Sequence, residues 1–363
     1  MLYGTAQNGG TNAEGTVFKL TTNGTSFSTL YNFSAVDGNG FNPDGALPVA
    51  GFILSGNTLY GTASAGGATG DGTLFKLGTN GANFNIIYSF TALDPTTQTN
   101  LDGATPLASL LLSGSTLYGT ASQGGSNADG TVFYVNTNGS NFSTLYSFTG
   151  SNDGAAPASS LLLSGNVLYG TASQGGAAGN GTIFQLNTSG SGFSTLYSFS
   201  DLDLDAQTNS DGAGPVANLI LSSNILYGTA YAGGPSGYGT IFEINTNGSG
   251  FISLLSFDAD NNGANPAGGL ALSNNILYGT TQSGGSGGDG TIFAVNLLEA
   301  VPIRLYIQRV GTNVVLTWSN PIFGLQAAPN AQTNYFTNVP GATSPYTNAI
   351  TAKPQFFRLR AGQ

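Results

Sequence analysis

The sequence has 363 residues, of which 40% are hydrophobic, 7% are charged, and none is cysteine or histidine. This length can bury a large core, and the missing residue types exclude disulfides, Cys/His zinc sites and histidine acid–base catalysis. The net charge of −10 disfavours nucleic acid as a partner, and no apolar run is long enough for a transmembrane helix.

Four short apolar segments recur in a fixed order over residues 1–298. One contains Leu-Tyr-Gly-Thr, first at 2–5, and the next contains Gly-Thr-(Val/Leu/Ile)-Phe, first at 15–18. An aromatic segment follows, first at 27–33, and then a Leu-rich segment such as 110–112. The unit repeats every 51 to 58 residues, which indicates a tandem-repeat architecture.

The segments are expected to be strands, because they are short, rich in β-branched and aromatic residues, and bounded by turn residues. Asn-Gly pairs between the Gly-Thr-(Val/Leu/Ile)-Phe segment and the aromatic segment suit type I′ hairpin turns. Four-stranded meanders of this period predict an all-β fold, a β-propeller of about six four-stranded blades, with a β-solenoid as the alternative. The segments number 22, whereas six complete blades need 24, so the first blade lacks a Leu-rich strand and the last an aromatic one.

These motifs resemble the GloVer tandem-repeat family of bacterial secreted or surface proteins. The residues that carry the resemblance are the repeated LYGT, the Gly-Gly loop, GT(V/I)F and the (L/Y)SF…DG…P run. The resemblance implies an extracellular or cell-surface location, but it implies no activity. No export signal precedes the first repeat, so we expect the chain to be N-terminally truncated.

From about residue 299 the pattern changes. Residues 314–318 and 356–359 are expected to be strands of a small C-terminal β-sandwich-like module ending in Phe-Phe-Arg-Leu. The predicted domains are therefore a propeller at 1–298 and this module at 299–363.

Strand direction predicts which loops share a face. The loop with the Gly-Gly pair, between the Leu-Tyr-Gly-Thr strand and the Gly-Thr-(Val/Leu/Ile)-Phe strand, is called here the GG loop. The segment from an aromatic strand to the next Leu-rich strand is called the connection. Because strands of a meander alternate in direction, both loop types are expected on one face. Of the 17 acidic residues, 15 lie in these loops, and all length variation lies in the connections. This face is the predicted binding face.

The candidate ligand-binding residues are five acids and tyrosines that interrupt the repeat near its fifth copy, together with Asp211 of the recurrent Asn/Asp pair. Carboxylates beside exposed tyrosines could hydrogen-bond and stack on a sugar, although sequence drift in a solvated loop is the simpler explanation. The candidates are Asp201, Asp203, Asp205, Asp211, Tyr231 and Tyr238.

A candidate calcium site lies at Asp258, Asp260 and Asn262, which alternate before Gly263 as in the first half of an oxygen-rich calcium loop. The twelfth-position glutamate of such a loop is absent, and an Asx-turn is the structural alternative. Calcium is the only cofactor that the sequence suggests.

The predicted function is a monomeric, non-enzymatic binding or adhesion scaffold, extracellular or on the cell surface, for a glycan or a protein, with no membrane insertion. The alternative is a carbohydrate-active enzyme, a glycoside hydrolase or polysaccharide lyase, because two carboxylates suffice for glycoside hydrolysis. Its discriminating feature would be whether Asp203, Asp205 and Asp211 converge.

Overall fold

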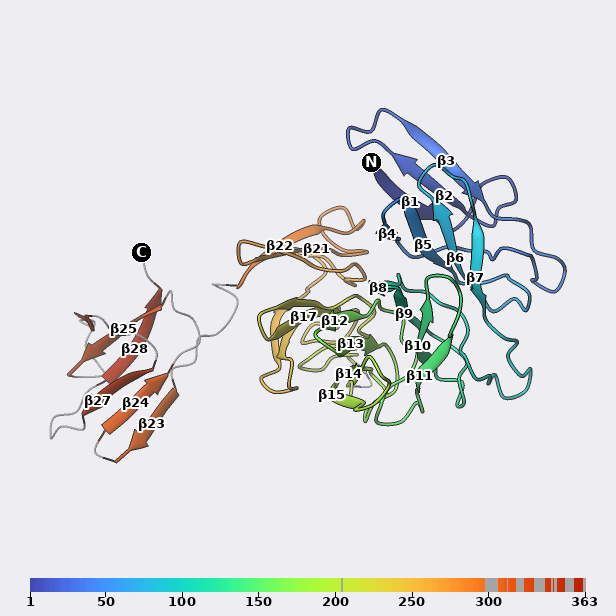
Figure 1. The fold of residues 1–363 in the computed structure, drawn as a ribbon. Coiled ribbons are helices and arrows are strands. Elements are labelled where there is room, and N and C mark those ends of the chain that lie inside the picture. The colour runs from blue at the N-terminus through green and yellow to red at the C-terminus, as the bar shows by residue number, and fades with distance from the viewer. Residues whose placement is uncertain are drawn as a thin grey trace. The chain divides into compact units, whose positions relative to one another are not determined.

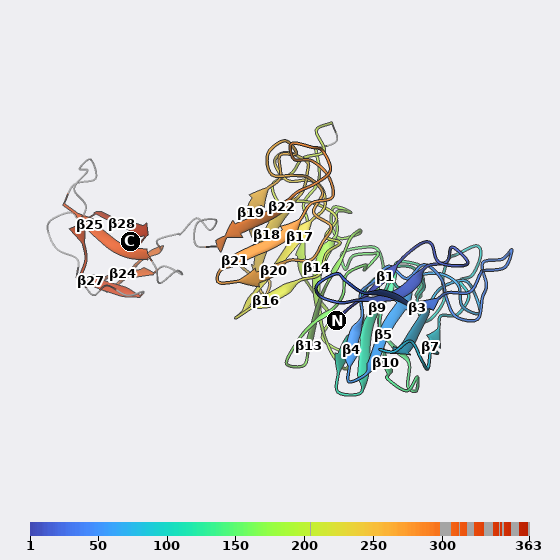
Figure 2. The same ribbon diagram turned by 90° about the horizontal axis from the view of Figure 1, so that it is seen from above.

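The computed structural model is all-β throughout the residues that it describes (Figures 1 and 2). The described residues are 1–203, 205–297, 306–311, 313–317, 323–329, 337–340, 342, 345–349 and 356–361. No helix among them is both long and apolar enough to cross a bilayer.

The repeat region forms six antiparallel sheets, called blades 1 to 6 below, and each is a meander of consecutive strands. Blades 2 to 5 have four strands, whereas blades 1 and 6 have three. Among the described residues, blade 1 therefore has no Leu-rich strand and blade 6 no aromatic strand, as predicted. The strands are β1 (Leu2–Ala6), β2 (Thr16–Leu20) and β3 (Phe27–Asn32) in blade 1; β4 (Ile53–Ser55), β5 (Thr58–Ala63), β6 (Thr73–Gly78) and β7 (Asn85–Ser89) in blade 2; β8 (Leu111–Ser113), β9 (Thr116–Ala121), β10 (Thr131–Asn136) and β11 (Ser143–Ser147) in blade 3; β12 (Leu162–Ser164), β13 (Val167–Ala172), β14 (Thr182–Asn187) and β15 (Ser194–Ser198) in blade 4; β16 (Ile220–Ser222), β17 (Ile225–Ala230), β18 (Thr240–Asn245) and β19 (Ile252–Ser256) in blade 5; and β20 (Ala271–Ser273), β21 (Ile276–Thr280) and β22 (Ile292–Asn296) in blade 6.

The turns that lead into the aromatic strands, which lie between β2 and β3 in blade 1 and between the third and fourth strands in blades 2 to 5, differ from the prediction. In blade 1 the Gly24 amide donates to the Thr21 carbonyl, and Gly24 has a positive φ of 74°. Asn23 has no positive φ, so the predicted type I′ turn is wrong. The hairpin needs only one left-handed residue, and glycine takes that position without a Cβ clash.

Each blade packs face to face on the next, so the core is a series of layers between blades. Between blades 2 and 3, Leu74 and Phe90 pack against Leu117 and Phe133 in one buried cluster. Clusters of the same composition join blades 1 and 2, 3 and 4, and 4 and 5. This layer between two blades is called a joint below, and its repetition explains why the same apolar residues recur in every repeat.

The connection and the GG loop lie against each other, as strand direction predicted. An isolated antiparallel bridge pairs Ala104 of a connection with Gln123 of the GG loop in blade 3. The same bridge occurs once for each of blades 2 to 6. The two loop types therefore share one face of each blade.

The C-terminal residues form two three-stranded antiparallel sheets around the buried Leu316 and Leu325. Contacts divide the chain into one unit of 1–272 and 278–294 and another of 273–277 and 295–363. The predicted boundary between 298 and 299 lies outside the described residues. The strands of the two sheets are β23 (Tyr306–Val310), β24 (Asn313–Thr317) and β27 (Tyr346–Ala349), and β25 (Phe323–Ala328), β26 (Thr337–Asn338) and β28 (Phe356–Ala361).

Candidate functional site

In the connections before blades 2 to 5, the aspartate of the last Asp-Gly pair is buried beside the aromatic strand of the preceding blade. Asp102, which is 5% exposed, accepts hydrogen bonds from the Tyr88 hydroxyl (2.7 Å), the Thr91 amide (2.9 Å) and the Thr91 hydroxyl (2.5 Å). These three donors stabilise the ionised carboxylate away from water. The arrangement recurs at Asp44, Asp153 and Asp211, with the tyrosines Tyr31, Tyr146 and Tyr197.

The tyrosines of these pairs resist ionisation. Burial is the main cause that raises the pKa of Tyr88 far above its ordinary value of 10, and the hydrogen bond to Asp102 and its charge add to it. The pKa values of Tyr31, Tyr146 and Tyr197 are raised for the same reasons. Each of these tyrosines therefore keeps its proton at neutral pH and remains a hydrogen-bond donor.

The asparagine before the aspartate holds the connection to the GG loop. The Asn100 side chain donates to the carbonyls of Thr91 (2.9 Å) and Gly103 (2.8 Å). It accepts from the amides of Gly103 (2.9 Å) and Gly125 (2.8 Å). Asn42 and Asn209 make the corresponding bonds. These amides have a structural role in the connection.

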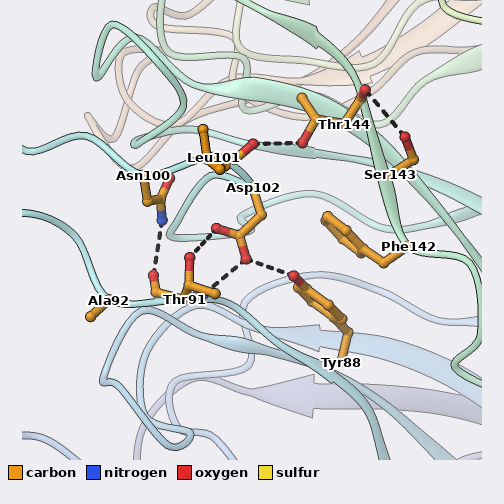
Figure 3. A pocket seen from close by; sticks show the side chains of 9 residues that line it. All are labelled: Tyr88, Thr91, Ala92, Asn100, Leu101, Asp102, Phe142, Ser143 and Thr144. Carbon is orange, nitrogen blue, oxygen red and sulfur yellow. Dashed lines mark hydrogen bonds between the residues drawn. The ribbon is translucent and has the colours of Figure 1, made fainter.

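A shallow cavity of 610 Å³ opens at the joint between blades 2 and 3 (Figure 3). The Tyr88 and Phe142 rings stack on one side of it, with centroids 3.7 Å apart and planes 5° apart. Leu101 is 84% exposed at the cavity, and its carbonyl accepts a hydrogen bond from Thr144 (2.8 Å). The lining residues are Tyr88, Thr91, Ala92, Asn100, Leu101, Asp102, Phe142, Ser143 and Thr144.

This cavity offers apolar surface and hydroxyl groups, but its one carboxylate, Asp102, already accepts three hydrogen bonds from the protein. Such a lining can bind a ligand by contact and hydrogen bonding. The sequence prediction missed Leu101 and Phe142. The available signal was Leu101 itself, a large apolar residue between two polar ones, where other connections have proline, asparagine or serine.

The structure brings the candidate ligand-binding acids to one connection but not to one pocket. Asp201, Asp203 and Asp205 are exposed on the connection between blades 4 and 5, whereas Asp211 is 3% exposed. The Asp211 carboxylate accepts from Tyr197 (2.8 Å) and from the Ser200 hydroxyl. None of the four lines either of the two cavities found at blades 2 and 3.

Asp203 has a counterpart in the repeat, which corrects the sequence interpretation. Its Oδ1 accepts from the amides of Asp205 (3.0 Å) and Ala206 (2.8 Å). Asp94 accepts in the same way from the amides of Thr96 and Thr97 in the other long connection. Both are Asx-turns that close a loop. The two connections share Leu-Asp before the turn and Gln-Thr-Asn after it, at 93–100 and 202–209, so the sequence already held the signal for this alignment.

The two candidate tyrosines lie in the GG loop of blade 5. The Tyr231 hydroxyl donates to the Gln282 side chain (2.9 Å), which links blade 5 to blade 6. Tyr238 is 44% exposed, and the neighbouring Gly237 lies against the backbone of Gln207 in the acidic connection. Only Tyr238 therefore combines exposure with a place next to that connection.

The candidate calcium residues form a closed turn. Asp258 Oδ1 accepts from the amides of Asn261 (2.9 Å) and Asn262 (3.2 Å), and the pKa of Asp258 is lowered by its hydrogen bonds to Asn261 and Asn262. Asn262 Oδ1 accepts from the Asp258 amide (2.8 Å), and Asp260 is exposed. This is the Asx-turn geometry of the structural alternative. Within the described ranges, no three His, Cys, Asp or Glu side chains group as a metal site.

Six blade-like sheets joined by repeated layers define a tandem-repeat protein of the propeller class. Residues 204–307 match the model of the Gloeobacter/Verrucomicrobia repeat family. The match covers less than half of the chain, and the repeated motifs of residues 1–298 resemble the same repeat. No curated protein matches the chain in sequence.

Solved structures offer distant likenesses. One is a chain of a nidogen/laminin complex, with 14% identity and a TM-score of 0.49 over 82% of this chain and 90% of that one. Another is TolB from Acinetobacter baumannii, with 12% identity and a TM-score of 0.41 over 85% and 58%. A third is a putative 6-phosphogluconolactonase from Bacteroides uniformis, with 14% identity and a TM-score of 0.46 over 98% of each chain. They carry no information about binding or catalysis here.

Proposed function

We propose that the protein is a monomeric, non-enzymatic binding or adhesion scaffold, extracellular or on the cell surface, whose ligand is a glycan or a protein. The observation that carries the proposal is the cavity at the joint of blades 2 and 3. It places the exposed Leu101 beside a stacked Tyr88–Phe142 pair and a carboxylate that needs no further partner. Apolar surface with a few fixed polar groups suits recognition.

Further exposed apolar side chains lie in the same kinds of loop. Phe41, in the connection before blade 2, is 40% exposed, and Tyr238, in the GG loop of blade 5, is 44% exposed. Both stand among glycines and small polar residues. Aromatic groups beside amides and hydroxyls favour sugar or protein ligands.

We do not extend the proposal to a carbohydrate-active enzyme. Hydrolysis needs one carboxylic acid and one carboxylate that can reach the same bond. Asp211 is buried against Tyr197, and Asp203 caps its own loop. Asp203 and Asp211 would have to leave these bonds before they could act on a sugar.

The test is a screen of glycans and of surface proteins, followed by Leu101→Asp. The Leu101 side chain makes no structural hydrogen bond, so the variant is expected to fold normally and to bind at least about tenfold more weakly, a loss of ~1.4 kcal/mol. Leu54→Asp is the control, because Leu54 is 52% exposed on the β4 strand and lines neither cavity. An empty screen, or equal loss in both variants, would contradict the proposal.

Calcium is proposed only as a stabilising ligand of the 258–263 loop. If it binds there, millimolar calcium raises the Tm, and Asp260→Asn abolishes the rise. Asp260 is the suitable position because, unlike Asp258, it is exposed on the loop and does not cap it. An unchanged Tm would remove calcium from the proposal and leave the binding scaffold in place.

A further inference from the structure

The leading face of a blade, defined as the side that packs on the preceding blade, is covered in the same way at four joints. The phenylalanine just before the fourth strand stacks on the tyrosine of the preceding blade, with ring centroids 3.7 to 3.8 Å apart. A second phenylalanine, on the third strand, meets the last phenylalanine of the preceding aromatic strand edge to face. The stacked pairs are Tyr31–Phe84, Tyr88–Phe142, Tyr146–Phe193 and Tyr197–Phe251.

Blade 1 presents the same leading face with no blade against it among the described residues. Phe27 occupies the position of Phe84 and Phe142, yet it is 64% exposed and its only ring contact is with Phe18 of its own blade. Leu2 is 53% exposed, whereas its counterparts in blades 2 to 6 are fully buried. Apolar exposure at these positions is specific to blade 1.

The glycine of the turn before each aromatic strand shows independently that the leading face of blade 1 is uncovered. A Cβ at Gly81 would lie 3.0 Å from the Leu30 carbonyl oxygen of the preceding blade, and one at Gly139 would lie 2.8 Å from that of Ile87. Gly190 and Gly248 are approached in the same way. At Gly24 of blade 1 no atom lies within 4 Å of that position. Gly24 thus occupies the position at which the other blades contact the backbone of the preceding blade, but no such blade contacts it among the described residues.

We propose that the leading face of blade 1 is a docking site for another blade of this repeat, bound through that blade's aromatic fourth strand. The four internal joints specify the partner, which must carry a Tyr-x-Phe strand so that the tyrosine stacks on Phe27 and the phenylalanine meets Phe18. A second copy of the chain does not fit, because its last blade ends at β22 and has no aromatic fourth strand among the described residues.

The experiment supplies such a blade. A copy of residues 161–224 is fused ahead of Met1, so that Met1, Leu2 and Tyr3 follow it as Ile225, Leu226 and Tyr227 follow the original segment. The chain has no cysteine, so Phe27→Cys gives one thiol whose reaction rate reports coverage. Leu54→Cys, at a position with 52% exposure on β4, is the matched control.

Docking is expected to slow the reaction of Phe27→Cys by about tenfold or more, the effect of a ~1.4 kcal/mol preference for the covered state. Leu54→Cys should react at the same rate with and without the fusion. Replacing the copied Tyr197 by Ala should restore much of the reactivity at residue 27. Equal rates in fused and unfused chains would overturn the proposal.

Two further outcomes also count against it. If the added copy is removed by limited proteolysis while the parent chain survives, the leading face of blade 1 does not hold a blade. If the unfused chain dimerises and Phe27→Asp makes it monomeric, the occupant is a second copy, and the proposed partner is wrong.

Discussion

At the scale of single residues, the main finding is that acids which the sequence suggests for binding have a structural role. Asp102 and its three counterparts are at most 9% exposed, and each accepts a tyrosine hydroxyl. A buried carboxylate is tolerated when it is hydrogen-bonded, and its loss of partners is costly. The acidic face expected from the sequence is therefore less charged at its surface than the count of 17 acids indicates.

Tyr88→Phe tests this role. The variant keeps the ring that stacks on Phe142 and removes only the hydroxyl that donates to Asp102. We expect a loss of about 1–3 kcal/mol in the free energy of unfolding, since a buried carboxylate loses a donor. Urea unfolding measures it, and Tyr238→Phe, at an exposed position, should change the value by less than about 0.5 kcal/mol. Similar losses in both variants would show that the hydroxyl–carboxylate bond is not stabilising.

At the scale of strands and connections, blade 5 lacks both the tyrosine and the aspartate of the hydrogen-bonded pair that blades 1 to 4 share. Leu255 stands where the other aromatic strands have tyrosine, and Asn262 stands where their connections have aspartate. The Asn262 side chain accepts from the Asp258 amide and donates to the Ser256 carbonyl (3.3 Å). An amide can make both bonds, whereas a carboxylate there would lack the tyrosine that it needs.

A double-mutant cycle at these positions is therefore predicted to show coupling. Asn262→Asp alone should destabilise the protein, because it places a carboxylate against the Ser256 carbonyl. Adding Leu255→Tyr should recover part of the loss, with a coupling energy of about 0.5–3 kcal/mol. Chemical denaturation of the wild type, both single variants and the double variant gives the value, and simple additivity would contradict the expected pairing.

Much of this element structure was predictable from the sequence. Fixed spacing and turn residues gave all 22 strands of the repeat region, including which strands the end blades lack. The register shift between the third and fourth strands, as at Val132 and Phe133, was not predicted, because it leaves no distinctive residue in the sequence. The burial of Asp211 was missed for a different reason. Its partner Tyr197 lies on the preceding strand, and the sequence pattern does not show that the hydroxyl of a tyrosine in an apolar strand is directed at the aspartate.

At the scale of the whole molecule, one buried and four half-buried tyrosines couple stability to alkaline pH. Burial, followed by the charge of Glu243 and a hydrogen bond to it, raises the pKa of Tyr227 to about 12. The four tyrosines that donate to aspartates have pKa values raised in the same direction. A raised pKa in the folded state means that this contribution to stability is complete below the unfolded value of about 10 and is lost above it.

We therefore expect the urea midpoint to fall steeply between about pH 10 and pH 12, because the unfolded chain releases tyrosine protons first. Tyrosinate absorbance should rise together with unfolding, without a separate earlier step for these groups. Tyr227→Phe should make the fall less steep. A midpoint that stays constant across this range would contradict the prediction.

Because the joints are nearly identical, only the connectivity of the backbone determines which blade packs on which. Any Tyr-x-Phe edge of blades 1 to 4 offers the same chemistry to any leading face, so side-chain complementarity cannot distinguish the correct neighbour from a wrong one. Short tethers make that choice instead, because they hold consecutive blades at high local concentration. Lengthening a connection should thus increase mispairing during refolding before it costs any native stability.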